Sequence, residues 1–146
     1  DGLSSLAFVG DRLVFIENPS MVRIDLSSLE EVGDGMQVRE HDALTQIDMP
    51  LLQSTGGFFY LGENESLANI GDFNALVTVG AYFTLRNMPQ LTSIAGFAQL
   101  DLVAEDFRIS GNPQLPTCNA QALAMQLSSI GGITTIAGNL ADACGS

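Results

Sequence analysis

The sequence predicts a mainly β fold: a right-handed parallel β-helix, or leucine-rich-repeat-like solenoid, that forms a single domain. Two observations predict it, a periodic recurrence of apolar residues and a short alternating segment inside every period. The chain has 146 residues, of which 46% are hydrophobic, so it is long enough to bury a core. The recurrence distance is 23–24 residues, which lies in the range of solenoid repeats.

The recurrence stays in register over five columns of residues. One column, spaced by 23, 23, 24 and 24 residues, is Ile24, Ile47, Ile70, Ile94 and Cys118. Four others keep that spacing: Met21, Leu44, Leu67, Leu91 and Leu115; Leu6, Leu29, Leu52, Leu76 and Leu100; Val9, Val32, Thr55, Val79 and Val103; Gly10, Gly33, Gly56, Gly80 and Ala104. The columns predict five coils (1–24, 25–47, 48–70, 71–94 and 95–118) followed by a C-terminal cap over 119–146.

Each coil contains one alternating segment, and alternation of this length predicts a strand. The segments are 12–16, 35–39, 58–62, 82–86 and 106–110. Strands of successive coils must then pair in parallel, and such crossovers are almost always right-handed. The inward columns would be Leu13, Met36, Phe59, Phe83 and Phe107, and Phe15, Val38, Leu61, Leu85 and Ile109. Elsewhere, apolar residues three apart, such as Leu26 and Leu29, predict a helical turn or a tight bend rather than a long helix.

A polar turn follows every strand, and one position in it is asparagine in four of six copies. The column is Asn18, His41, Asn64, Met88, Asn112 and Asn139. Asparagine tolerates turn geometry, and stacked asparagines can hydrogen-bond the backbone of the neighbouring coil. We therefore interpret the column as a structural ladder, and His41 as a turn residue rather than as a base or a metal ligand.

The last repeat departs from the pattern. Residues 119–132 have apolar residues at helical spacing and end in two glycines, which predicts a helix closed at Gly131-Gly132. Residues 133–139 then predict a final strand and turn. Two cysteines and one histidine cannot complete a tetrahedral metal site, so a disulfide between Cys118 and Cys144 is the simplest interpretation. The alternative is a pair of buried free thiols.

The net charge of −12, with no lysine, argues against nucleic acid as a partner. The acidic residues suit a solvated, self-repelling surface; the alternative, calcium binding, lacks an EF-hand loop in this sequence. No glycine-rich phosphate motif points to a cofactor, and no apolar stretch reaches the roughly 20 residues of a membrane span. We thus expect no cofactor, no metal and no membrane insertion by this segment.

The outward positions of the predicted strands carry an unusual set of side chains. They hold four of the five arginines and both tyrosines, but only one of the 17 acidic residues, Asp106. With coils about 4.8 Å apart, they would form a strip roughly 20–25 Å long. The candidate ligand-binding residues are Arg12, Arg39, Phe58, Tyr60, Tyr82, Thr84, Arg86 and Arg108. Arginine and aromatic residues are enriched at recognition surfaces, but they also stack well on a passive exposed sheet. Both interpretations stay open.

Catalysis is not expected. The outward strip has no pair of carboxylates for glycoside chemistry, and no G-x-S-x-G nucleophile elbow occurs. The opening residues, DGLSSL, resemble the start of an interior repeat, so we expect a mature or trimmed chain, and whether further coils precede it stays open. The alternative to a recognition module is therefore a spacer in a larger surface protein. The first coil leaves an open strand edge, through which two chains can associate. We therefore expect a monomer or a weak edge-to-edge dimer.

Copies of the form L-x-x-V-G-x-x-x-[LF]-x-[IL]-x-x-N-P-x-L-x-x-I resemble the receptor L-domain superfamily. The ending NPQLPTC…LSSIGGITTIAGN…C is similar to the cap of its bacterial secreted and surface-anchored members, and the resemblance covers residues 1–144. The third copy departs from it at Thr55 and in the turn ENES. The resemblance implies a leucine-rich β-helical module, secreted or anchored at the cell surface, whose ligand is a protein or a glycan.

Overall fold

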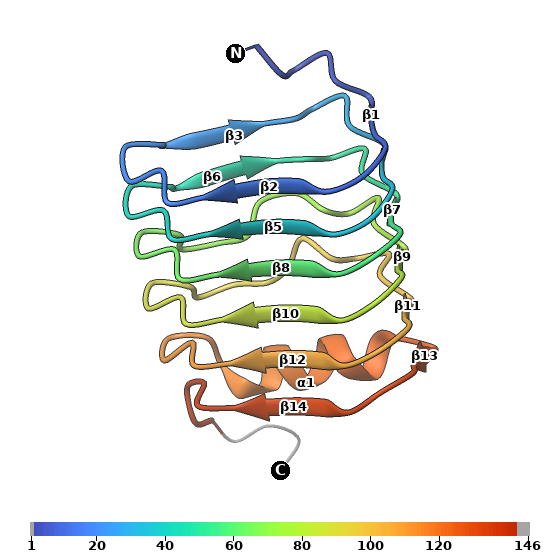
Figure 1. Cartoon of the computed structure of the whole chain (residues 1–146). Coiled ribbons are helices and arrows are strands. Elements are labelled where there is room, and N and C mark those ends of the chain that lie inside the picture. The colour runs from blue at the N-terminus through green and yellow to red at the C-terminus, as the bar shows by residue number, and fades with distance from the viewer. Residues whose placement is uncertain (1, 143–146) are drawn as a thin grey trace.

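A computed structural model describes residues 2–142, and it has the predicted solenoid architecture of about five coils with parallel sheets. Figure 1 shows the coils stacked one below another, with the strands of each face aligned along the stack. The main sheet has six parallel strands: β2 (Leu13–Ile16), β5 (Met36–Arg39), β8 (Phe59–Gly62), β10 (Phe83–Arg86), β12 (Phe107–Ser110) and β14 (Thr134–Ala137). Five of them match the alternating segments to within one residue.

Two smaller sheets form the other sides. The narrow sheet has six two-residue strands: β1 (Phe8–Val9), β4 (Glu31–Val32), β7 (Ser54–Thr55), β9 (Thr78–Val79), β11 (Leu102–Val103) and β13 (Ser129–Ile130). A third sheet pairs β3 (Arg23–Asp25) with β6 (Gln46–Asp48). The narrow sheet contains the valine column, which the sequence identified as a repeat without predicting a strand there.

Pairing in the main sheet keeps equivalent residues side by side. Leu13 pairs with Met36, Met36 with Phe59, Phe59 with Phe83, and Phe83 with Phe107. These steps are 23 or 24 residues, as the sequence predicts. Parallel pairing in this register places every side chain over its counterpart in the next coil, about 4.8 Å away.

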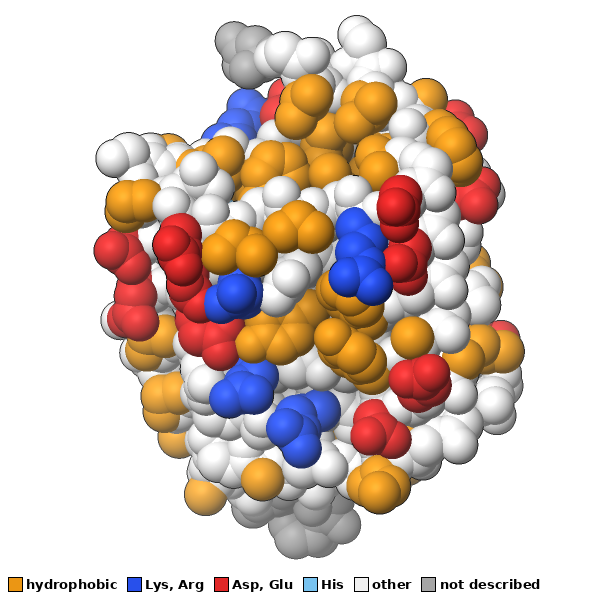
Figure 2. Space-filling view, viewed as in Figure 1, with side chains coloured by type: hydrophobic (Ala, Val, Ile, Leu, Met, Phe, Trp, Pro, Cys, Tyr) orange, Lys and Arg blue, Asp and Glu red, His pale blue; other side chains and the backbone are white. Residues whose placement is uncertain are grey.

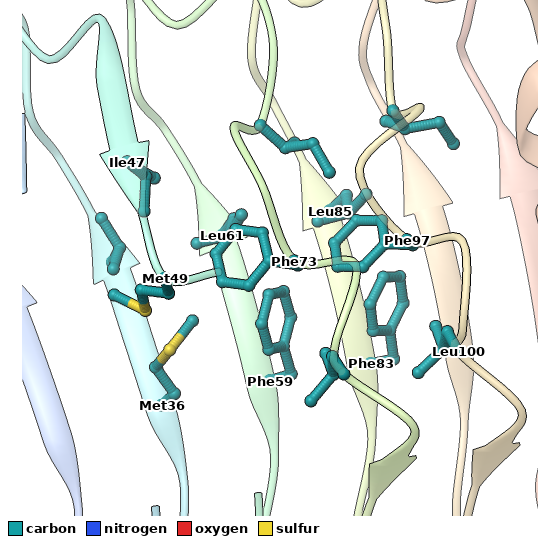
Figure 3. Close-up of a cluster of buried hydrophobic side chains, with 14 of the residues drawn as sticks. Met36, Ile47, Met49, Phe59, Leu61, Phe73, Phe83, Leu85, Phe97 and Leu100 are labelled. Carbon is teal, nitrogen blue, oxygen red and sulfur yellow. The ribbon is translucent and has the colours of Figure 1, made fainter. Parts of the chain in front are cut away.

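The core is a stack of aromatic and aliphatic columns. The inward columns of the main sheet are buried except at its two ends, where Phe15 and Ile136 are half-buried and Thr134 is exposed. Phe83 stacks on Phe59 and on Phe107, with ring centroids 5.2 Å apart in both pairs. Phe73 and Phe97 form a second stack at 5.5 Å and meet Phe59 edge-on (Figure 3). Such offset and edge-to-face contacts add to the burial of apolar area.

The bends expected between apolar residues three apart are present. The N–H of Leu29 donates to the carbonyl of Leu26, and the same bond joins Leu76 to Phe73, each at 3.0 Å. Beside the narrow sheet, the glycine column brings backbones together: a Cβ at Gly56 would collide with the carbonyl oxygen of Gly33. Glycine is required there by close approach rather than by a turn.

The C-terminal helix differs from its prediction at both ends. Helix α1 spans Thr117–Gln126, and residues 127–132 are not helical. The prediction of a helix closed by Gly131-Gly132 is therefore wrong, because Ser129–Ile130 instead joins the narrow sheet as β13 beside β11. The helix is held to the fifth coil by the Gln126 amide, which donates to the carbonyls of Phe97 and Leu100 at 2.9 Å each. Cys144 lies outside the described residues, so its pairing with Cys118 stays a prediction.

The phenylalanine stack makes a stability prediction. Phe83→Ala would leave a cavity between Phe59 and Phe107 and should lower the free energy of unfolding by about 3–5 kcal/mol. Phe8→Ala, at an exposed position of β1, is the matched control and should change it by less than about 1 kcal/mol. Urea unfolding followed by circular dichroism measures both. Equal losses for the two variants would contradict the stacked core.

Candidate functional site

The candidate residues lie on the outward face of the main sheet, which we call the outer strip. It consists of the outward side chains of residues 12–16, 35–39, 58–62, 82–86 and 106–110. The register places Val14, Gln37, Tyr60, Thr84 and Arg108 in one row, each over the next. Figure 2 shows this face, with blue arginines and orange apolar side chains gathered over the strands and red acidic side chains at both flanks.

Two aromatic rings of the outer strip form a short stack along the solenoid axis. Phe58 and Tyr82 lie nearly parallel, with an interplanar angle of 7° and centroids 5.1 Å apart. The guanidinium carbon of Arg12 lies 5.7 Å from the centroid of the Phe58 ring, within the range of a cation–π contact. Phe58 can approach in this way because Gly35 lies beneath it; a Cβ at that position would collide with the ring.

Tyr60 is the neighbour of this stack but takes no part in it. Its ring leans over Gly62, and its hydroxyl donates to the carboxylate of Glu63 at 2.8–2.9 Å. Burial, together with the hydrogen bond to Glu63, raises the pKa of Tyr60 to about 12. Burial also raises the pKa of Tyr82. Both phenols therefore stay neutral hydrogen-bonding groups at physiological pH.

Acidic residues outside the strip neutralise most of its arginines. Arg12 pairs with Asp34 at 2.9 Å, Arg39 pairs with Glu40, and Arg86 lies 3.6 Å from Glu63. The sequence predicts a strip nearly free of acidic residues, and this is true of the strip positions themselves. The residues that flank the strip, however, are acidic. Among residues 2–142, Arg108 is the one arginine of the strip without an ion pair, and its side chain is exposed.

A hollow of about 330 Å³ opens in the outer strip, and we call it the Thr84 hollow. Its lining is Tyr60, Tyr82, Thr84, Arg86, Glu105, Asp106 and Arg108. Thr84 is only 7% exposed, whereas Tyr82 is 37% exposed. Five of the lining residues are candidate ligand-binding residues from the sequence, and Asp106 is a sixth that occupies an outward position of the strip. Glu105 was missed, because it precedes β12 and its position in the alternation predicted that it would point away.

The turn column forms a ladder of buried hydrogen bonds. Nδ2 of Asn64, Asn112 and Asn139 donates to the carbonyls of Val38, Leu85 and Ile109 in the preceding coil, at 2.9–3.2 Å. Oδ1 of each asparagine accepts the backbone N–H of the residue at the same turn position in the preceding coil. For Asn139 this distance is 3.2 Å. Asn18, in the first coil, donates instead to the carbonyl of Ile16 in its own turn, at 3.0 Å.

His41 occupies an asparagine position of this ladder. Nε2 lies 3.1 Å from the Phe15 carbonyl, and Nδ1 lies 3.2 Å from the N–H of Asn18. In the tautomer with the proton on Nε2, histidine makes the same two bonds as asparagine. Both nitrogens are engaged and the residue is fully buried, so this imidazole faces the backbone and not the solvent.

The residue that follows each main-sheet strand has a left-handed backbone. It is Glu17, Glu40, Glu63, Asn87, Gly111 and Gly138, with φ between 51° and 69°. Three glutamates at this position are unusual, since side chains other than Asn and Gly rarely adopt it. From this position, Glu40 pairs with Arg39 and Glu63 lies beside Arg86 at the edge of the outer strip. The sequence signal for this feature is the glutamate that begins each of the turns ENP, EHD and ENE.

Two structural features are absent from residues 2–142, the part of the chain that the structure describes. This region contains no group of three or more His, Cys, Asp or Glu side chains placed to hold one ion. No helix in it is long and apolar enough to cross a bilayer. In comparisons with protein-family models, curated proteins and solved structures, nothing matched the chain. The resemblance to receptor L domains thus stays an expectation based on the repeat.

The ladder predicts an asymmetry between two substitutions of His41. His41→Ala leaves a buried carbonyl and a buried N–H without partners and should destabilise the fold by about 2–4 kcal/mol. His41→Asn restores both bonds and should cost less than half as much. Asn18→Ala, at an exposed position, is the control and should be close to neutral. Chemical unfolding measures all three, and an Asn variant as unstable as the Ala variant would refute the ladder role.

The tyrosine environments predict alkaline behaviour. Neither tyrosine should ionise at the ordinary pKa of about 10, and Tyr60 should ionise near pH 12. Because the folded pKa of Tyr60 is above the unfolded one, the contribution of Tyr60 to stability should be fully present below about pH 10 and be lost as pH rises toward about 12. Ultraviolet titration of tyrosinate measures the ionisation, and Tyr60→Phe should remove the highest transition. A normal two-tyrosine titration in the folded state would contradict both environments.

Proposed function

We propose that this chain is a non-catalytic recognition module that works outside the cell or at its surface. It binds a protein or a glycan through the outer strip. The observation that carries the proposal is the Phe58–Tyr82 stack beside the unpaired Arg108, around the Thr84 hollow. Rigid aromatic rings and arginine forks provide much binding energy for little loss of side-chain entropy.

The packing of the strip supports recognition over a passive surface. A passive exposed sheet gains nothing from an uncovered aromatic face or a hollow, whereas a binding face needs both. The ring pair is preorganised by Gly35 below Phe58 and by Arg12 at its end. Preorganised side chains lose less freedom on binding.

The proposal of a non-catalytic role rests on what the titratable groups near the strip already do. Oδ1 of Asp106 accepts the N–H of Ile133 at 2.8 Å, Glu63 is bound by Tyr60, and His41 belongs to the ladder. These groups are engaged in structure rather than paired as acid and base. The extracellular location follows from the resemblance to secreted L domains and from the expected disulfide.

One observation favours the alternative of a spacer module. The first coil exposes apolar side chains, among them Leu3, Phe8, Val14 and Val22, and β2 pairs on one side only. An open strand edge with apolar neighbours can stack on another coil. A spacer would use this end for contact and leave the outer strip empty, and a weak edge-to-edge dimer would form in the same way.

The two functions are separated by a binding screen against extracellular proteins and glycans. For the ligand found, the double variant Tyr60→Ala/Tyr82→Ala should weaken binding by at least about tenfold while folding stays intact, because both rings lie outside the core. Phe8→Ala, an exposed aromatic residue on the narrow sheet, is the control and should bind normally. Undiminished binding by the double variant would place the site elsewhere. A complete lack of ligands, together with self-association through the first coil, would favour the spacer.

A further inference from the structure

The Thr84 hollow begins where the aromatic stack ends. Phe58 covers one face of the Tyr82 ring, since the two rings are parallel at 5.1 Å. The next residue of that row is Asp106, which is too short to cover the opposite face. The uncovered face of Tyr82 therefore lines the hollow, together with the short side chain of Thr84. The order along the axis is Arg12, Phe58, Tyr82 and then the Thr84 hollow.

The polar groups around this space differ in kind. Arg108 stands over Thr84 in the next strand and has no ion pair among the described residues. Arg86 lies 3.6 Å from Glu63 and also donates to the side-chain oxygen of Asn87 at 3.2 Å. Asp106 bonds the backbone through Oδ1, which leaves its other oxygen as an acceptor for a ligand hydroxyl. The hollow thus offers an apolar plate at Tyr82, the guanidinium groups of Arg86 and Arg108, and the carboxylates of Glu105 and Asp106.

We propose that the Thr84 hollow binds one carboxylate-bearing sugar residue of an acidic glycan, with its ring against Tyr82 and its carboxylate at Arg108. The inference rests on the proposed recognition function and names its ligand. The C–H face of a pyranose is apolar and suits the electron-rich face of an aromatic ring. The ring hydroxyls meet Asp106 and the Thr84 hydroxyl. The carboxylate meets the guanidinium fork, the geometry in which charge-assisted bonds are strongest.

Charge and size both point to this class of ligand. The chain carries a net charge of −12, so an anion is repelled by most of its surface and can be held only where a cation is free. Arg108 is such a place. The hollow, at about 330 Å³, is at the lower end of ligand sites, which fits one sugar unit rather than a large apolar group.

A peptide is a poorer fit to the same hollow. Thr84 lies in β10, which pairs with β8 on one side and β12 on the other. No backbone edge is free there, so an extended peptide cannot add to the sheet and would be bound through side chains alone. The donors and acceptors instead surround a flat apolar surface, as the hydroxyls of a sugar surround its ring.

The test is isothermal titration calorimetry of the folded chain with short carboxylated glycans. The probes are oligogalacturonate, oligomannuronate, a hyaluronan fragment and sialyllactose, with cellotetraose and lactose as neutral counterparts. At least one carboxylated glycan should bind and its neutral counterpart should not. Methyl esterification keeps the ring and removes the charge, so it should weaken binding of a uronate probe by at least about tenfold.

Four variants locate the site. Arg108→Gln and Tyr82→Ala should each weaken binding by at least about tenfold, whereas Tyr82→Phe keeps the aromatic plate and should stay within about threefold. Arg23→Gln, on the third sheet, is the matched charge control and should bind normally. Since Arg108 is exposed and unpaired, its variant should fold as the parent does. A glycan that binds with no dependence on Arg108 and Tyr82 would overturn the inference.

The inference and the proposed function fail separately. If a protein, an acidic peptide or a neutral glycan binds the outer strip and no carboxylated glycan does, the inference is overturned and the recognition function stands. If no ligand of any class depends on the strip, both are overturned.

Discussion

Parallel pairing in register between coils is the constraint on which the rest of this structure depends. It places each residue about 4.8 Å from its counterpart in the next coil, so a side chain must be compatible with another of its own kind. In the core, phenylalanine meets this requirement by stacking on the ring of the next coil. At the turn, asparagine meets it by donating a hydrogen bond to a backbone carbonyl of the preceding coil. Glycine satisfies it where backbones nearly touch, as Gly56 does against Gly33. Columns of identical residues are therefore the cause of the fold as well as its signature.

The same constraint makes the outer strip informative, because charges in a column would repel. The strip avoids this by alternating arginines with small or aromatic residues and by drawing carboxylates from the turns. Those carboxylates come from glutamates in a left-handed conformation, which costs backbone energy at Glu40 and Glu63. Arg108 receives no such partner among residues 2–142. Arg108 is therefore a solvated cation at the edge of the Thr84 hollow on a protein that is acidic elsewhere. This local difference in charge favours an anionic ligand.

Prediction from sequence succeeded where the position of a residue in a strand was enough to assign its side chain to the inside or the outside. Leu13, Phe59 and Phe107 were correctly placed inside because strand alternation has a period of two. It failed where two elements compete for the same residues. Ser129 and Ile130 have helical spacing, yet they become β13 because β11 offers an unpaired edge and Asp101 binds the backbone of Ser128. The narrow sheet was missed for a related reason: strands of two residues, such as β7, are too short to show alternation.

The sequence by itself determined the period, the inward columns, the asparagine ladder and the identity of the outward side chains. These follow from local rules: a fixed repeat, a period of two and the tolerance of turn residues. Only the tertiary structure decided which of those outward groups remain available. Tyr60 is turned onto Glu63, three arginines are paired, and the free face of Tyr82 and the guanidinium of Arg108 meet at one hollow. Such pairing depends on distances between coils, which a linear pattern does not contain.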